Sequence, residues 1–168
     1  MTIVVVMGVS GSGKTTVAAG VAAAFGWTLL EGDSFHPAAN VAKMKAGIPL
    51  TDEDRWPWLR AIAAREDELR AAGQSAAVAC SALKRAYRDI LIGDRSDTSL
   101  LYLRGTTALI AERMRLRKGH FMPPALLESQ FAALEEPEPD EHPIIVNIAG
   151  PAEAVIGVAI RQLKERLS

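Results

Sequence analysis

The 168-residue sequence has little cysteine, no excess of charge of one sign and no long hydrophobic run. Its single cysteine, Cys80, excludes an internal disulfide and supplies no cluster of metal ligands. The net charge of −1 leaves no basic excess of the kind that binds nucleic acid or an anionic membrane. Basic residues that matter for function are therefore expected to act locally, in a site.

Signals for export or membrane insertion are also missing. The apolar run at residues 2–7 has no basic segment before it and is interrupted by a glycine-rich loop, unlike a signal peptide. No later apolar stretch is long enough to span a bilayer. We expect a cytoplasmic protein with neither nucleic-acid nor membrane partners. Cys80, at the end of a predicted strand, is expected to be a small apolar side chain rather than a reactive thiol.

Strand and helix patterns alternate along the chain, without an internal repeat, linker or low-complexity tract. Strands are predicted at 2–7, 27–31, 75–80, 99–103 and 144–148, and helices at 14–25, 38–45, 52–72, 83–91, 106–118, 123–135 and from 150 onward. Thr51 to Asp54 resembles a capping box, with Asp in place of the usual Glu. The alternation predicts one α/β domain over residues 1–168, with a parallel sheet covered by helices on both faces.

The segment from Gly8 to Thr15 fits the phosphate-loop pattern G-x-x-x-x-G-K-[ST] at every fixed position, between a predicted strand and a predicted helix. In such a loop the backbone N–H groups and the helix N-terminus converge on phosphate oxygens. Lys14 is expected to reach the β- and γ-phosphates, and Thr15 to ligate Mg²⁺. The predicted nucleotide-binding residues are Gly8, Ser10, Gly11, Ser12, Gly13, Lys14, Thr15 and Thr16.

The rest of the chain indicates which kind of phosphate-loop protein this is. The third predicted strand ends without the carboxylate found in motor and GTPase proteins, whereas Glu31-Gly32-Asp33 follows the second strand. That arrangement resembles small-metabolite kinases of the nucleoside monophosphate kinase class, in which an acid here approaches the acceptor hydroxyl. Arg113 and Arg117 are four residues apart, on one face of a helix. We expect the end of this helix to lead into a lid over approximately residues 114–126, with Arg117 stabilising the transferred phosphoryl group.

Several further blocks carry a more specific resemblance. They are Met7 to Lys14, Gly32-Asp33 with His36-Pro37 and Asn40, Lys43-Met44, Gly47 to Leu50, Asp52, Asp54-Arg55, Pro57 to Leu59, Cys80 to Lys84, Tyr87 to Asp89, Arg117 to Phe121, Gln130-Phe131, Leu134-Glu135 and Pro137. In these residues the chain resembles the gluconate kinases almost from end to end. Glu31, where Asp is common, and Thr15, where Ser is common, are departures that preserve the chemistry.

The resemblance implies a P-loop fold with five parallel strands in the order 2-3-1-4-5. It implies transfer of the γ-phosphoryl group of ATP to the 6-hydroxyl of D-gluconate, with Mg²⁺ as cofactor and often a homodimeric enzyme. Asp33 is then the candidate for orienting the acceptor hydroxyl and taking its proton, and for touching Mg²⁺ through water. Adenine is expected to lie between the helix face that bears Arg113 and the loop at residues 147–151.

Gluconate is an anion, so its pocket needs a cation for the carboxylate. Arg55, Lys84 and Arg88 lie in the most specific blocks; Arg55 and Arg88 are favoured because the planar guanidinium suits a carboxylate, and ordinary salt bridges are the alternative. His36, His120 and Gln130 are candidates for hydrogen bonds to substrate hydroxyls, or for plain packing roles. Trp56 and Trp58 are expected to anchor their helix in the core.

Other readings stay open from sequence alone. A kinase of another small acid or alcohol, such as shikimate, or a nucleotide kinase would share the phosphate loop. A non-catalytic ATP-binding protein would need neither Asp33 nor Arg117, so the presence of both favours an enzyme.

Overall fold

The computed structural model describes residues 1–116 and 124–168. Its strands are β1 (Ile3–Met7), β2 (Thr28–Glu31), β3 (Ala76–Ala79), β4 (Thr98–Arg104) and β5 (Ile144–Asn147). Its α-helices are α1 (Lys14–Phe25), α2 (Ala38–Lys45), α3 (Asp52–Ala71), α4 (Arg85–Leu91), α5 (Thr107–Leu116), α6 (Pro124–Ala133) and α7 (Ala152–Leu167), with 3₁₀ turns η1 (Gly32–Phe35) and η2 (Pro139–Glu141).

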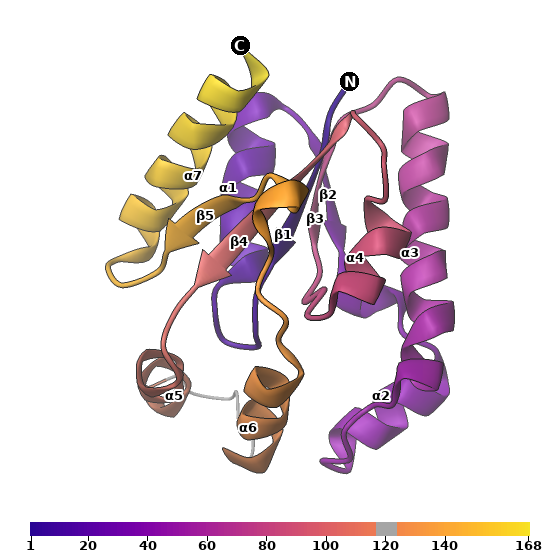
Figure 1. Ribbon diagram of the computed structural model, residues 1–168, viewed down its shortest axis with the longest axis vertical. Coiled ribbons are helices and arrows are strands. Elements are labelled where there is room, and N and C mark those ends of the chain that lie inside the picture. The colour runs from indigo at the N-terminus through magenta and orange to yellow at the C-terminus, as the bar shows by residue number, and fades with distance from the viewer. Residues whose placement is uncertain (117–123) are drawn as a thin grey trace.

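The five strands form one parallel sheet in the order β2-β3-β1-β4-β5, as predicted. Helices α1 and α7 cover one face, and α3 and α4 cover the other (Figure 1). The predicted elements are confirmed to within one or two residues at most of their ends. No helix within 1–116 and 124–168 is long and apolar enough to cross a membrane.

Strand β1 is buried on both faces, which explains its continuous β-branched sequence. Val4 and Val6 pack into the core beneath α1 and α7, whereas Ile3 and Val5 pack into the core beneath α3. Because side chains alternate along a strand, one apolar run supplies both cores. The central strand is therefore held rigidly, and the loop after it starts from a fixed point.

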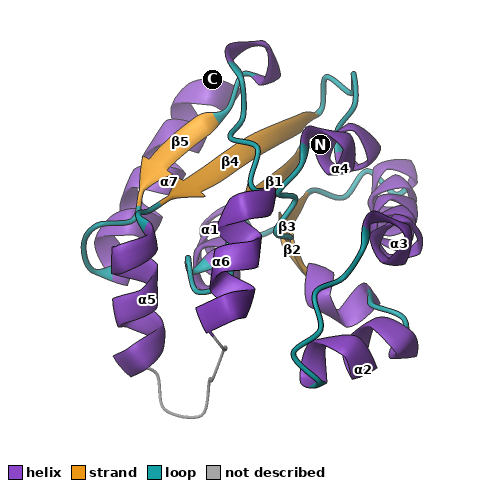
Figure 2. Ribbon diagram, turned by 60° about the horizontal axis from the view of Figure 1, so that its bottom comes forward, coloured by secondary structure: helices purple, strands orange, loops and turns teal. Residues whose placement is uncertain are grey.

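The carboxyl ends of the strands all point to one edge of the sheet, where α2, α5 and α6 also lie (Figure 1). Seen toward that edge, α5 and α6 stand side by side and α2 lies across from them (Figure 2). In open parallel sheets ligands bind at this edge, in the crevice outside the carboxyl ends of the strands. The predicted phosphate loop lies at this edge.

Candidate active site

The phosphate loop connects β1 to α1. Gly13 has φ 93°, in the left-handed region, and no side chain caps the first turn of α1. The first N–H groups of the helix are therefore available to an anion. Gly11, at φ 82°, packs against α5: a Cβ there would lie 2.9 Å from Cγ of Met114. Glycine is required at both positions by conformation, and at Gly11 by space as well.

Lys14 lies at the start of α1, and its ammonium group donates a hydrogen bond to the carbonyl of Val9 at 3.1 Å. Burial lowers the pKa of Lys14 from its usual value, and the nearby carboxylate of Asp33 opposes that shift. The lysine is thus folded back along the loop with a charge that is poorly solvated. A phosphate group arriving at the loop would supply the missing negative partner.

Thr15 donates a hydrogen bond from Oγ1 to Glu31 Oε2 at 2.9 Å. The other carboxylate oxygen, Glu31 Oε1, is buried and has no hydrogen-bond partner. A hydroxyl beside an unsatisfied carboxylate offers the hard oxygen ligands that Mg²⁺ prefers, directly or through water. Within the described residues no group of three His, Cys, Asp or Glu side chains could hold a metal, so the ion would depend on nucleotide phosphates as well. Thr16, the next residue of α1, is exposed.

Ser10 joins the phosphate loop to α6. Its N–H donates to Gln130 Oε1 at 2.6 Å, and Gln130 Nε2 donates to Ser10 Oγ at 2.8 Å. Ser12 is buried with a hydroxyl that lacks a partner. The two hydrogen bonds between Ser10 and Gln130 fix the phosphate loop to a residue 120 positions later in the sequence.

A cavity of about 560 Å³ opens beside the loop. Its walls come from the phosphate loop, η1, the segment that leads from α2 into α3, and α6. The predicted site residues that line it are Ser10, Lys14, Asp33, His36, Arg55 and Gln130. Its volume lies in the range typical of small-molecule sites.

Asp33 lies in the η1 turn directly after β2, and its side chain is 90% exposed on the cavity side. Gly32 places it there by packing against the carbonyl of Ala79, where a Cβ would not fit. The indole N–H of Trp58 donates to the carbonyl of Gly32 at 2.8 Å. The carboxylate is therefore free, and the backbone that carries it is fixed.

His36 stacks on Trp58, with ring centroids 4.1 Å apart. Its Nε2 lies 4.0 Å from Asp33 Oδ1, and its Nδ1 is 3.2 Å from the amide nitrogen of Asn40. Burial lowers the pKa of His36 below its usual value, so the ring is neutral near pH 7. Trp58 itself is buried in the core, as expected for an anchor of α3.

Arg55 and Lys84 differ in their partners. Arg55 Nη1 donates to the hydroxyl of Tyr87 at 3.1 Å, and the guanidinium forms no ion pair with any carboxylate in the described part of the chain. Lys84 is paired with Asp52 at 3.1 Å and lines a smaller cavity that shares Arg55 with the first one. Of Arg55 and Lys84, Arg55 is thus the one with open hydrogen-bonding capacity at the cavity.

Arg88 is not brought to this cavity. It is only 2% exposed, forms a two-bond ion pair with Glu141 at 2.6 and 3.2 Å, and donates to the carbonyls of Ala82 and Leu83. The expectation that Arg88 clamps the substrate carboxylate is therefore corrected: its donors are spent on joining α4 to η2. Sequence proximity to Lys84 could not reveal this, because Glu141 comes from 53 positions away.

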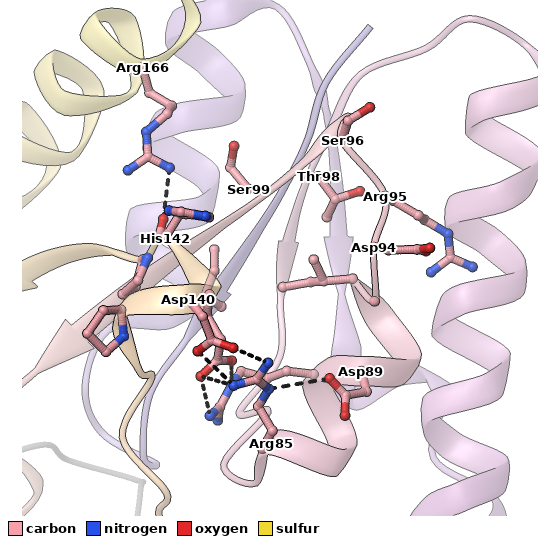
Figure 3. Close-up of a pocket in the computed structure, with 17 residues that line it drawn as sticks. Arg85, Asp89, Asp94, Arg95, Ser96, Thr98, Ser99, Asp140, His142 and Arg166 are labelled. Atoms are coloured by element: carbon pink, nitrogen blue, oxygen red, sulfur yellow. Dashed lines mark hydrogen bonds and ion pairs between the residues drawn. The ribbon is translucent and has the colours of Figure 1, made fainter.

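Arg88 borders a second, larger cavity of about 900 Å³ between α4, the start of β4 and η2. Figure 3 shows that several of its charged groups already have partners: Arg85 lies between Asp89 and Asp140, and Arg166 donates to the carbonyl of His142 at 2.8 Å. No phosphate-loop residue lines it. The cavity of about 560 Å³, which has unpaired groups beside the phosphate loop, is the candidate active site.

Arg113 lies on α5, as predicted, next to the segment after β5. Its Nη2 donates to the carbonyl of Gly150 at 2.8 Å and also to that of Ile148. It is therefore beside the segment at which adenine was expected. Arg117 and His120 fall outside the described residues, as does most of the predicted 114–126 lid.

The sequence patterns singled out fewer residues than the cavity uses. Glu31, not Asp33, is the carboxylate that contacts Thr15, and the sequence assigns Glu31 no role of its own. The wall formed by residues 44–50, with Leu126 and Ser129 of α6, was not assigned to the site. The dense motif from Gly47 to Trp58 was the available signal for that wall. Cys80 is buried and burial raises its pKa to about 12, so it is not a reactive thiol.

Comparisons with known proteins agree with this geometry. Residues 3–137 match a sequence family described as an AAA domain. The chain is 48% identical over 160 residues to a gluconokinase of Gluconobacter oxydans (strain 621H), covering 95% of this chain and 90% of that protein. Its fold matches the crystal structure of a gluconokinase from Sinorhizobium meliloti 1021, with a TM-score of 0.88 and 43% identity over 99% of this chain and 95% of that one.

A crystal structure of a sugar kinase from Janibacter sp. HTCC2649 is also similar, with a TM-score of 0.91 and 51% identity over 98% of this chain and 95% of that one. These matches cover almost the whole chain, and therefore include the segments that form the phosphate loop, the η1 turn and the cavity wall. On these grounds the chain belongs to the gluconokinase family of P-loop kinases.

Proposed function

We propose that this chain transfers the γ-phosphoryl group of ATP to the 6-hydroxyl of D-gluconate, giving 6-phosphogluconate and ADP. One observation carries the proposal: Lys14, Asp33 and Arg55 line the same cavity beside the phosphate loop. They supply a phosphate-binding cation, a free carboxylate for the acceptor hydroxyl and a free cation for the acceptor carboxylate. The names of the related proteins support gluconate as the acceptor.

The phosphate loop would hold the nucleotide. Free N–H groups at the start of α1 and the Lys14 ammonium bind the phosphates and spread their negative charge. Arg113, held by the carbonyls after β5, would border the adenine. Arg117 is expected to reach the transferred phosphoryl group, as the sequence predicts.

Thr15 and Glu31 would hold Mg²⁺ together with the nucleotide phosphates. The bound ion would neutralise phosphate charge. The hydrogen bond between these two side chains keeps their oxygens next to each other before the nucleotide arrives, so less ordering is left for binding.

Asp33 would act on the acceptor. Its exposed carboxylate can accept a hydrogen bond from the 6-hydroxyl and take its proton as the oxygen attacks the γ-phosphorus. Arg55 would bind the carboxylate at the other end of gluconate, and neutral His36 and Gln130 are placed on the wall for hydroxyl groups. Catalysis would then depend mainly on positioning, as in other phosphoryl transfers.

The direct test is an assay of ADP release with Mg-ATP and a panel of acceptors: D-gluconate, shikimate, glycerate, other sugar acids and nucleoside monophosphates. We expect turnover with gluconate far above the rest, and loss of turnover when EDTA removes the divalent ion. Strong turnover with a different acceptor would overturn the assignment of the substrate. ATP binding without turnover on any acceptor would overturn the assignment as a catalyst.

A further inference from the structure

Arg55 would ordinarily be expected to pair with Asp52. The two residues are three apart at the start of α3, a spacing that brings side chains together on one helix face. A guanidinium paired with a carboxylate of its own chain would have to be released before it could bind a carboxylate of the substrate. The described residues contain no such pair for Arg55.

Tyr87 occupies the place of that ion pair. It comes from α4, which lies beside α3 (Figure 1), and its residue is only 1% exposed. Its hydroxyl donates to Asp52 Oδ1 and accepts from Arg55 Nη1 at 3.1 Å. The phenol oxygen therefore stands between the carboxylate and the guanidinium and bonds to both.

The remaining capacity of Asp52 is taken by Lys84, whose ammonium lies 3.1 Å from Oδ1 and 3.4 Å from Oδ2. Two donors, a phenol and an ammonium, thus satisfy this carboxylate without Arg55. Burial and the bond to Asp52 raise the pKa of Tyr87 to about 12, so the phenol keeps its proton near neutral pH and stays a donor. Arg55 retains one neutral contact and lines the cavity.

We infer that Tyr87 is a positioning residue for substrate recognition: by satisfying Asp52 it holds Arg55 next to the cavity as an unpaired cation for the substrate carboxylate. This inference rests on the proposed function, in which Arg55 binds that carboxylate. It adds the reason why Arg55, rather than the neighbouring Lys84, is available. The residue acts through Arg55 and needs no contact with the substrate.

The test is the variant Tyr87→Phe, which keeps the buried ring and removes only the hydroxyl. Arg55 is then free to turn onto Asp52. We expect the KM for gluconate to rise about tenfold, the factor that corresponds to the loss of one hydrogen bond in a partly buried site. The kcat and the KM for ATP should stay within about twofold, because such a change removes ground-state and transition-state binding equally.

A matched control is Tyr102→Phe. Tyr102 is equally buried, and its hydroxyl donates to a carboxylate, Glu136, at 2.9 Å, with Arg104 beside the same carboxylate. None of these three residues lines the candidate active site. The KM for gluconate should be unchanged in this variant, so any general cost of removing a buried phenol appears in the control.

Adding Asp52→Asn to Tyr87→Phe tests the mechanism, since the amide cannot form an ion pair with Arg55. The KM of the double variant should fall back toward that of the unaltered chain. Failure of the KM to recover in the double variant would overturn the inference. So would a Tyr87→Phe variant with unchanged KM, or one that loses kcat or does not fold.

Arg55→Met separates a failure of the proposed function from a failure of this inference. If Arg55→Met leaves the KM for gluconate unchanged, the carboxylate site itself is wrongly placed. If it raises the KM while Tyr87→Phe does not, only the role of Tyr87 fails.

Discussion

Glu31 and Asp33 are two residues apart and have different surroundings. Glu31 is bonded to Thr15 and has one buried oxygen without a partner, whereas the side chain of Asp33 is 90% exposed at the cavity. The glycine between them lets the chain turn at the end of β2, so the two carboxylates serve different sides of the site. In the proposed function, Glu31 would serve the metal and nucleotide, and Asp33 would serve the acceptor.

Replacing Asp33 by Asn should lower kcat with gluconate by about 100- to 1,000-fold, since the amide cannot take the proton of the acceptor hydroxyl. The Kd of ATP, measured by calorimetry, should change little because Asp33 is not part of the phosphate loop. Ser34→Ala is the control: it removes one exposed hydrogen bond to the carbonyl of Glu31 in the same turn and should leave kcat nearly unchanged. Near-normal turnover of Asp33→Asn would contradict the assigned role.

Glu66 is a second informative acid; it lies on α3 but does not line the cavity. Its side chain is fully buried, Oε2 lies 3.3 Å from Arg70, and Oε1 has no partner. Burial outweighs the attraction of Arg70 and raises the pKa of Glu66 from about 4.5 to about 8. Between those pH values the folded chain keeps a proton that the unfolded chain releases, so the free energy of unfolding falls as the pH rises.

The variant Glu66→Gln cannot titrate and should lose this dependence. The free energy of unfolding of the unaltered chain, measured by urea denaturation, should fall between pH 5 and pH 8 by about 1–3 kcal/mol more than that of the variant. Glu68→Gln serves as the control, since the Glu68 side chain is 66% exposed. If Glu66→Gln and the unaltered chain respond equally to pH, the buried proton is absent.

At the scale of the element, the start of α3 decides the geometry of the acceptor side. Thr51 and Asp54 form the predicted capping box, with bonds of 2.9 and 3.2 Å in the two directions. Asp54 also pairs with Lys43 of α2 at 2.7 Å. The cap thereby fixes the first turn, which carries Asp52 and Arg55, and ties it to α2.

Thr51→Ala removes the hydroxyl that caps this turn. We expect a loss of about 1 kcal/mol in the free energy of unfolding, which for a chain of this size lowers the Tm by about 2–4 °C. Thr51→Ser keeps the hydroxyl and should retain most of the stability. A thermal melt followed by circular dichroism distinguishes the two, and equal losses in both variants would show that the cap contributes little.

At the scale of the whole molecule, the fold places the candidate active site and the cavity between α4, β4 and η2 in different parts of the chain, and their charged residues differ in how they are paired. The phosphate loop, η1, the 44–50 segment and α6 meet at the carboxyl edge of the sheet (Figure 2). The pairs formed by Arg85 and Arg88 with Asp140 and Glu141 join α4 to η2 around the other cavity (Figure 3). The first set has unpaired groups and the second has few, which is why only the first has the character of an active site.

This distinction predicts different effects for two neighbouring arginines. Arg88→Met leaves the buried side chain of Glu141 without its nearest cation, with only Arg85 at 3.7 Å, and should cost about 3–5 kcal/mol in the free energy of unfolding. Arg85→Met removes a more exposed guanidinium, which pairs with Asp89, Asp140 and Glu141, and should cost at most about 1 kcal/mol. Both variants should keep the KM for gluconate within twofold at 20 °C or below. A large rise in KM for Arg88→Met alone would restore Arg88 as the carboxylate clamp.

The amino-acid sequence by itself determined the features that depend on neighbours in the chain. The phosphate loop is one, because its glycines, Lys14 and Thr15 lie within a single short segment of the chain. The capping box at Thr51 is another, and the buried run of β1 is a third. Most element ends were also predicted to within one or two residues, since caps, glycines and prolines act over a single turn.

Only the tertiary structure decided which charged residues are free. The sequence favoured Arg55 and Arg88 over Lys84 by side-chain type, but could not show which of the three is free. Their partners come from elsewhere in the chain: Asp52 lies 32 positions before Lys84, and Glu141 lies 53 positions after Arg88. Tyr87 reaches Asp52 from another helix in the same way. A side chain's availability to a ligand depends on how its charge is already satisfied, and that is a property of the packed molecule.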